Sequence, residues 1–337
     1  MLSQKPENCF PANRRYAESL NNLASLYHAA GRYAEAEALY RKALDLLNPG
    51  DELSALVANN LAALDRAQGR YKEAEPLYRR ALETLAATRG AGSQQYAVTL
   101  YNVAELYRSE GRFAEAESNA RRALSLLDET TGPEDYYYAD CLAILAAIDR
   151  ATGRLDEAES YLLRALAIRE TKQGPSSGVV GITLNNLAEL YTAMRRYPEA
   201  ETCARRSVAV VEKALGPRHP ALAVSLNGLA QVLRFRSRYV EVEPLYTRAL
   251  AILANSVGEN HPDYARTLGN LAAYDAEQGR RSEASRLYRR SLAILTASLG
   301  PEHPDVVTQL ARLDSVDPAQ RRRTARITDT AKRPEVN

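Results

Sequence analysis

The sequence predicts an all-α protein, a right-handed α-solenoid of seven helical hairpins followed by a C-terminal capping helix. Within residues 20–44, apolar residues recur at helical spacing on both sides of a Gly31–Arg32 turn, which indicates two short helices. The turn position then recurs, after one step of 38 residues and five of 42, at Gly69, Gly111, Gly153, Arg195, Ser237 and Gly279. A single hairpin cannot bury both of its apolar stripes, so stacked copies must form one continuous core.

The first eleven residues contain Pro6 and Pro11 and have no helical periodicity. We therefore expect a loosely ordered N-terminal lead over 1–11 and a solenoid over 12–316. The hairpins are expected around 20–44, 61–85, 103–127, 145–168, 187–211, 229–253 and 271–295.

The connectors between hairpins carry a glycine that ends one helix and usually a proline near the start of the next. The connector from Gly174 to Gly181 holds three glycines, so we expect local flexibility there. After the seventh hairpin, Leu310 and Leu313 lie 42 residues beyond Leu268 and Leu271 and predict a lone capping helix. The basic segment 317–337 has few apolar residues and is expected to be disordered.

The charge distribution and the cysteines argue against a nucleic-acid-binding protein and against a disulfide-bonded one. The formal net charge of the 337 residues is +2, yet the segment from Ala319 onward carries +4, which leaves the solenoid at −2. A nucleic-acid partner is therefore not expected. Three widely separated cysteines, Cys9, Cys141 and Cys203, do not form a disulfide framework and fit a reducing compartment. No apolar run is long enough to cross a bilayer, so we expect a cytoplasmic protein with no membrane partner.

The repeated segment resembles the tetratricopeptide repeat. The motif consists of Leu20, Leu23, Ala24 and Tyr27 in the first helix, then Ala36, Tyr40 and Ala43 in the second. With its 42-residue period, the chain is similar to the variety found in kinesin light chains. The resemblance covers roughly residues 12–316. It implies a concave inner face that binds other proteins, and it is specific for the fold rather than for a partner.

Nothing in the sequence predicts catalysis, a cofactor, a metal or a small-molecule substrate. His219, His261 and His303 occupy one column of the repeat, separated by two helix widths per copy, so they cannot share one metal ion. We expect each to be a polar residue that settles the turn before a proline. The paired glutamates that open each second helix complement the helix dipole.

Asparagines form two columns on the first helices, although Asn is a poor helix former. The resemblance implies that such amides bind the backbone of an extended peptide. The alternative is hydrogen bonding between neighbouring hairpins, and both interpretations remain open. The candidate groove residues are Asn21, Asn22, Asn59, Asn60, Asn102, Asn185, Asn186 and Asn227.

A column of arginines lies beside the asparagines. It predicts a positive stripe for an acidic or C-terminal peptide segment, unless the guanidinium groups pair with Glu from a neighbouring helix. Its members are Arg66, Arg108, Arg150 and Arg234. Tyr101 and Tyr137 interrupt the polar columns and suggest an aromatic pocket for an apolar side chain; packing of the tyrosines on the preceding connector is the alternative.

These features together predict a non-catalytic scaffold that holds a peptide or partner protein in its groove. The alternative is a regulatory or sensor module that controls an enzyme supplied by another chain.

Overall fold

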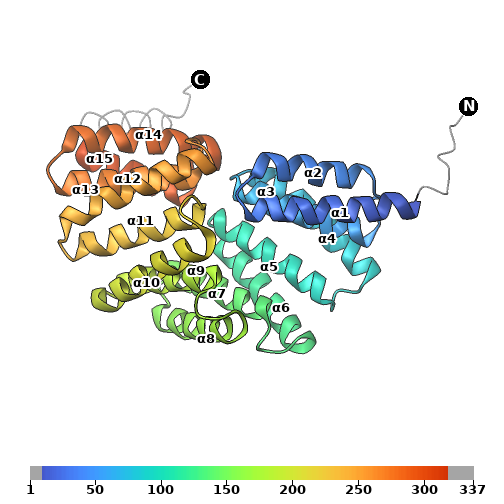
Figure 1. Ribbon diagram of the computed structural model, residues 1–337. Helices are drawn as coiled ribbons and strands as arrows, with labels where there is room; N and C mark the ends of the chain where they lie inside the picture. Colours follow the sequence, from blue (N-terminus) through green and yellow to red (C-terminus); the bar gives the residue numbers. More distant parts are fainter. Residues whose placement is uncertain (1–9, 318–337) are drawn as a thin grey trace, which may run out of the picture.

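The computed structural model describes residues 10–317, and in that range the regular structure is entirely α-helical (Figure 1). The helices are α1 (Phe10–Ala29), α2 (Tyr33–Asp45), α3 (Glu52–Ala67), α4 (Tyr71–Thr88), α5 (Gln94–Ser109), α6 (Phe113–Thr130), α7 (Tyr136–Thr152), α8 (Leu155–Gln173), α9 (Gly178–Ala193), α10 (Tyr197–Leu215), α11 (Pro220–Phe235), α12 (Tyr239–Ser256), α13 (Pro262–Glu277), α14 (Arg281–Leu299) and α15 (Pro304–Val316).

Consecutive helices pair as seven hairpins, from α1–α2 to α13–α14, and α15 packs on α14. The first helices of neighbouring hairpins contact one another from α1–α3 to α13–α15, so they form the inner layer of the solenoid. The predicted fold, seven hairpins and a capping helix, is confirmed. Residues 1–9 of the expected lead and 318–337 of the expected tail lie outside the described residues. The predicted bounds are corrected at both ends, because Phe10 and Pro11 already belong to α1 and Asp317 is held by Ser285 of α14.

Small and large apolar residues alternate at the contacts between hairpins. In α2, the buried residues Ala36, Tyr40 and Ala43 pack in one cluster with Leu61 and Leu64 of α3. The alanines let the helices approach closely, and each fully buried leucine contributes about 1.5–3 kcal/mol. Every hairpin thus covers the apolar face of the next, which explains why the hairpins are stable only when they are stacked in an array.

The arginine of each turn joins neighbouring hairpins. In the second hairpin, the Arg70 guanidinium lies 2.7 Å from Glu37 of the preceding hairpin. The same pairing recurs in Arg112–Glu75, Arg154–Glu117, Arg196–Glu159, Arg238–Glu201 and Arg280–Glu243. The second glutamate of each pair therefore connects hairpins, in addition to lying near a helix N-terminus.

The glycine-rich connector before α9 is more tightly packed than expected. Gly178 and Gly181 belong to α9 itself and face Leu215 and Val211 of α10. A Cβ atom at Gly181 would lie 2.5 Å from Val211 Cγ2 and 3.2 Å from the Val211 backbone nitrogen. These glycines therefore permit close helix packing, which corrects the expectation of flexibility at this end of the connector.

The solenoid curves so far that its first three hairpins lie beside its later helices α11, α13 and α15 (Figure 1). His219, His261 and His303 each place Nε2 on a backbone carbonyl oxygen 190 to 194 residues earlier in the chain. The pairs are His219–Ala29 at 3.0 Å, His261–Ala67 at 2.5 Å and His303–Ser109 at 2.7 Å. We call this contact, between the turns of the first three hairpins and the starts of α11, α13 and α15, the seam.

The geometry of each seam histidine fixes its tautomer. In His261, Nδ1 accepts a hydrogen bond from the Asp263 backbone N–H at 3.1 Å and caps α13, so Nε2 carries the hydrogen and donates across the seam. His219 and His303 do the same for α11 and α15. The expectation that these histidines settle a turn before proline is confirmed, and their contact across the seam is an additional role.

Candidate interaction surface

The inner layer carries the predicted asparagines, and most of those with a defined partner bond to each other. Asn60 Nδ2 donates to Asn21 Oδ1 at 3.0 Å, and Asn102 Nδ2 donates to Asn59 Oδ1 at 2.9 Å. Within hairpins, Asn21 and Asn59 donate weakly to the adjacent Asn22 and Asn60 at 3.4 and 3.3 Å. One continuous chain of amide hydrogen bonds, from Asn102 through Asn59, Asn60 and Asn21 to Asn22, therefore connects the first three hairpins.

In the second half of the solenoid, the asparagines make different hydrogen bonds. Asn227 Oδ1 accepts from Asn270 Nδ2 at 3.1 Å. Asn185 is buried, donates to Glu189 at 3.0 Å, and packs its Oδ1 against the Cα side of Gly228, where a Cβ would clash. Its neighbour Asn186 is partly buried. These contacts favour a role in joining hairpins for Asn21, Asn59, Asn60, Asn102 and Asn227.

The arginine column is paired with glutamates of the inner layer. Arg66 and Arg108 share Glu105, at 3.3 and 2.9 Å. Arg150 lies 2.9 Å from Glu189, and Arg234 lies 3.5 Å from Glu277. Except for Arg108, each arginine reaches a glutamate of the following hairpin. The predicted positive stripe is thus largely charge-compensated, with one glutamate for two arginines at Glu105.

The seam brings further charges to this part of the inner surface. Arg266 lies 2.8 Å from Asp263 and 2.6 Å from Asp305. Burial alone would raise the pKa of Glu105, but Arg108 and Arg66 hold it below its usual range. Burial would likewise raise the pKa of Asp263, and Arg266, His261 and Arg108 outweigh it. Charges from both ends of the solenoid therefore act on one another across the interior.

The two tyrosines of the suggested pocket are both partly buried against the core. Tyr101 and Tyr137 pack on a cluster that includes Leu100, Leu142 and Ala139. The Tyr137 ring makes an edge contact with Tyr136, with ring centroids 5.1 Å apart. Much of their apolar area therefore serves packing between the third and fourth hairpins, and the pocket stays a prediction.

Comparison with known families identifies the repeat. Family models described as tetratricopeptide repeat match residues 17–47, 51–129, 95–171, 179–255 and 237–297, which is most of the described solenoid. The chain belongs to the tetratricopeptide repeat family. None of the curated proteins matches the sequence.

Solved structures share the tetratricopeptide solenoid at low identity. A Rap protein complexed with competence and sporulation factor is 14% identical, with a TM-score of 0.55 over 91% of this chain and 99% of that one. The Cut9–Hcn1 hetero-tetramer of the APC/C is 16% identical, with a TM-score of 0.60 over 89% of this chain and 53% of that one. BtubC (BKLC) from P. vanneervenii is 24% identical, with a TM-score of 0.48 over 74% and 91%. At these identities the likeness concerns the fold.

Two contacts of this tetratricopeptide array escaped the sequence reasoning, although the sequence carries a signal for each. The turn arginine and the glutamate 37 residues before it both recur with the 42-residue period, and that constant offset could have revealed their pairing. The dipeptide His-Pro occurs only in the connectors before α11, α13 and α15, which are the connectors at the seam.

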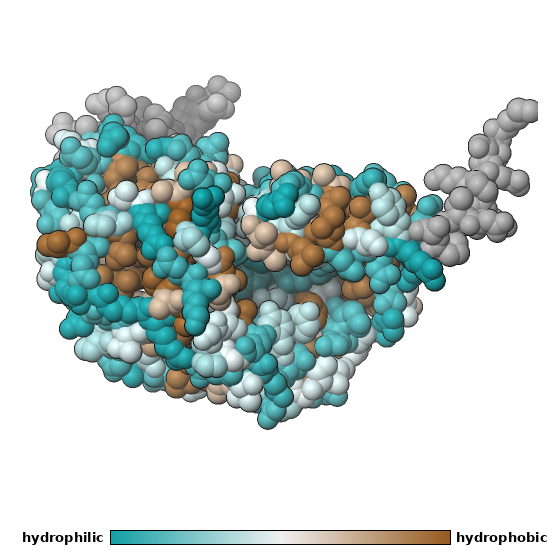
Figure 2. Space-filling model, in the orientation of Figure 1, coloured by the Kyte–Doolittle hydropathy of each residue, from teal (hydrophilic) through white to brown (hydrophobic). Residues whose placement is uncertain are grey.

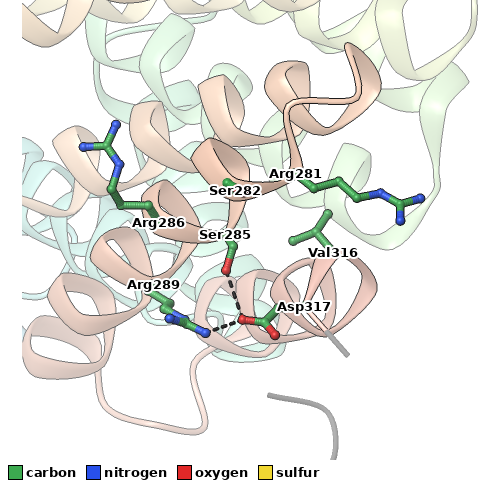
Figure 3. Close-up of a pocket in the computed structure, with 7 residues that line it drawn as sticks. All are labelled: Arg281, Ser282, Ser285, Arg286, Arg289, Val316 and Asp317. Carbon is green, nitrogen blue, oxygen red and sulfur yellow. Dashed lines mark hydrogen bonds and ion pairs between the residues drawn. The ribbon is translucent and has the colours of Figure 1, made fainter. Parts of the chain in front are cut away.

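A cavity of about 410 Å³ lies at the C-terminal end of the tetratricopeptide array. It is lined by Arg281, Ser282, Ser285, Arg286, Arg289, Val316 and Asp317. Asp317 is held there by Arg289 and by Ser285 Oγ at 3.1 Å, whereas the side chains of Arg281 and Arg286 diverge (Figure 3). This arrangement anchors the end of α15 on α14.

Within residues 10–317 no group of three or more His, Cys, Asp and Glu side chains could hold a metal ion. In the same range no helix is both long enough and apolar enough to span a membrane.

Proposed function

We propose that this tetratricopeptide array is a non-catalytic interaction module whose inner surface binds an extended segment of a partner protein. Proteins of this family are generally non-catalytic. A regular repeat also keeps equivalent side chains apart, which suits binding along a line better than convergence on a reacting atom. The concave face of such a solenoid is an extended surface of the kind that takes a peptide.

The observation that carries the proposal is a set of unpaired donors in the arginine column. Arg66 and Arg108 each have a buried Nε, and Arg234 has a buried Nη1, without a hydrogen-bond partner among the described residues, while Arg234 Nε forms the ion pair with Glu277. More than about 90% of buried polar groups in folded proteins are hydrogen-bonded. Because these donors are buried in the free protein, the arginine side chains of α3, α5 and α11 would have to turn toward the groove before backbone carbonyls or carboxylates of a bound segment could satisfy them.

The partner segment is expected to include an acidic group. Arg66 and Arg108 have only Glu105 between them, so a carboxylate of the ligand would balance the second guanidinium. The charge cluster around Arg266 and Asp263 faces the same interior and limits how far an acidic ligand extends toward the seam. Binding should therefore weaken with salt, as the Debye length falls from about 10 Å at 0.1 M to about 3 Å at 1 M.

The test is a selection of random extended peptides on the intact protein, followed by titration of the selected peptides. Arg108→Ala should weaken binding by about tenfold, the equivalent of about 1.4 kcal/mol. Arg79→Ala is the matched control, because Arg79 lies on the outer helix α4 with 68% of its side chain exposed. Circular dichroism should give the same helicity for both variants.

Selected peptides that bind Arg108→Ala and Arg66→Ala as tightly as the wild type would refute binding at the inner arginines. Selected peptides without acidic residues and without salt dependence would refute the acidic segment and leave the binding surface in place.

A further inference from the structure

At the N-terminal end of the described solenoid, one face of α1 exposes apolar residues that the later hairpins bury against the hairpin before them. Tyr16, Leu23 and Leu26 are 47%, 41% and 67% exposed, and Ser19 lies between them and is also exposed. Their spacing of three, four and three residues places them in one stripe along the helix. Figure 2 shows hydrophobic residues gathered on this part of the surface, where Figure 1 draws α1 in front.

The same four positions are covered in the later hairpins. The equivalents of Leu23 and Leu26 in α3 are Leu61 and Leu64, which are 2% and 0% exposed and pack against α2. The equivalents of Ser19 run from Val57 to Gln309 and are at most 5% exposed. Among all the equivalents of these four positions in the described helices, two are only partly buried: Leu271 in the Leu23 column and Val316 in the Leu26 column. The stripe on α1 therefore continues an interface that the chain makes with itself at each later hairpin.

At the opposite end, the exposed residues of the described range do not form a matching apolar stripe. There α15 covers α14, so that Ala284, Tyr288 and Leu313 form one buried cluster. Beside it, arginines, serines and the anchored Asp317 line the surface between α14 and the end of α15 (Figure 3), and Val307, 56% exposed, is the large apolar residue that α15 leaves open. Head-to-tail stacking of copies would place the apolar stripe of α1 on this polar end. An isologous contact, in which the same face meets itself around a twofold axis, is the arrangement that closes the surface.

We propose that α1 is a dimerisation helix and that its partner is the α1 of a second copy, packed antiparallel around a twofold axis. The spacing of Tyr16, Ser19, Leu23 and Leu26 is that of the a and d positions of a heptad, which suits packing of two long helices at a small angle. With the axis midway between Ser19 and Leu23, the small Ser19 faces the large Leu23 of the other copy. Tyr16 then faces Leu26.

Dimerisation through α1 would leave the inner surface of each copy unobstructed and place two of them in one particle. A partner that carries two copies of the bound segment would then gain avidity without any new contact. This inference rests on the face of α1 alone, and it holds or fails independently of what the inner surface binds.

The experiment is sedimentation equilibrium of the full chain between about 1 and 200 µM. We expect a concentration-dependent mass that approaches twice 37.2 kDa. Leu26→Glu should raise the dimer dissociation constant at least tenfold, because it places two carboxylates in an apolar contact. Val240→Glu is the control: Val240 is 92% exposed on α12, outside the stripe, and its substitution should leave the dimer unchanged.

Leu26 is exposed, so the variant should keep wild-type helicity, and Leu23→Glu provides a second test of the same face. A wild-type protein that remains monomeric over the whole range would overturn the proposal, and another helix or segment would then cover α1. A dimer that survives both Leu26→Glu and Leu23→Glu, or one that Val240→Glu also disrupts, would overturn it as well.

Discussion

At the scale of single residues, Arg169 is the least expected side chain in the core. Its column holds Leu47, Leu85, Leu127, Val211, Leu253 and Leu295 in the other hairpins. Arg169 is nevertheless 6% exposed, and it pairs with the buried Asp140 of α7 and donates to Thr183 Oγ1 of α9 at 2.5 Å. Burial raises the pKa of Asp140 to about 6, against the effect of Arg169. A buried pair of this kind is costly to break and gives little stability of its own.

Replacement of one partner of the Arg169–Asp140 pair should therefore lower the free energy of unfolding more than replacement of both. Arg169→Leu leaves the Asp140 carboxylate buried without a cation, and we expect a loss of about 3–5 kcal/mol of unfolding free energy. The double variant Arg169→Leu/Asp140→Val restores the residues that Leu127 and Val98 provide one hairpin earlier and should regain most of that loss. Urea unfolding followed by circular dichroism measures both. A single variant as stable as the wild type would show that the pair is solvated.

At the scale of the element, α9 and α10 pack closely because α9 has glycines where it faces α10. A helical glycine normally costs about 0.5–1 kcal/mol relative to alanine, so Gly→Ala in an open helix stabilises a protein. Gly181 faces Val211 too closely for this to hold. The absence of a side chain at this position is thus a packing requirement of the hairpin.

Gly181→Ala should destabilise the protein, by about 1–3 kcal/mol, because the new methyl group overpacks the contact with Val211. The measurement is the urea midpoint of unfolding. Gly181→Ala/Val211→Ala, which removes the opposing methyl groups, should recover part of the loss. If Gly181→Ala proved more stable than the wild type, α9 and α10 would be further apart than described here.

The hairpins themselves were predictable because their determinants are local. Each stripe is read within one helix, and the turn position with its Arg or Gly recurs along the chain. The side-chain contacts between hairpins were harder to predict from the sequence. The sequence places Asn60 and Asn21 on one face, yet whether an amide bonds to its neighbour or to a ligand depends on a rotamer and on a residue 39 positions away. The same holds for Arg66 and Glu105.

At the scale of the whole molecule, the seam adds contacts between hairpins that are far apart in the sequence, which a linear array of repeats lacks. Stability of a repeat protein is ordinarily a sum of repeats and nearest-neighbour contacts. Here the first three hairpins also contact the starts of α11, α13 and α15. The seam depends on the small rotation that accumulates from one hairpin to the next, and no local pattern encodes that rotation. This is why it could not be derived from the repeat alone.

The seam also explains a difference between turns. A Cβ at Gly111 would lie 2.8 Å from the Pro304 ring, so this turn of the seam excludes a side chain. The turns of the fifth and sixth hairpins, which do not belong to the seam, hold Arg195 and Ser237 at positive φ as well, at 60° and 57°. A side chain is thus excluded most strongly at Gly69 and Gly111 of the seam, whereas Gly153 and Gly279 have open space beside them, so glycine there relieves only the strain of the left-handed backbone.

The last prediction separates the two roles of the seam histidines. Asparagine caps helices well but is too short to reach the carbonyl across the seam, so the triple variant His219→Asn/His261→Asn/His303→Asn should keep its helicity and lose the seam. We expect the radius of gyration, roughly 20 Å for a compact chain of this length, to grow by several ångströms in X-ray scattering. Urea unfolding should become less cooperative, since the two ends are then free to unfold separately.

The control for this experiment is Asp135→Asn, which changes the N-cap of α7 at a connector outside the seam. It should alter neither the radius of gyration nor the cooperativity. An unchanged radius and a single sharp transition in the triple variant would mean that the proline–glycine contacts hold the ends together without the histidines. Gly111→Ala, which forces the Pro304 ring away, would then be expected to open the same seam.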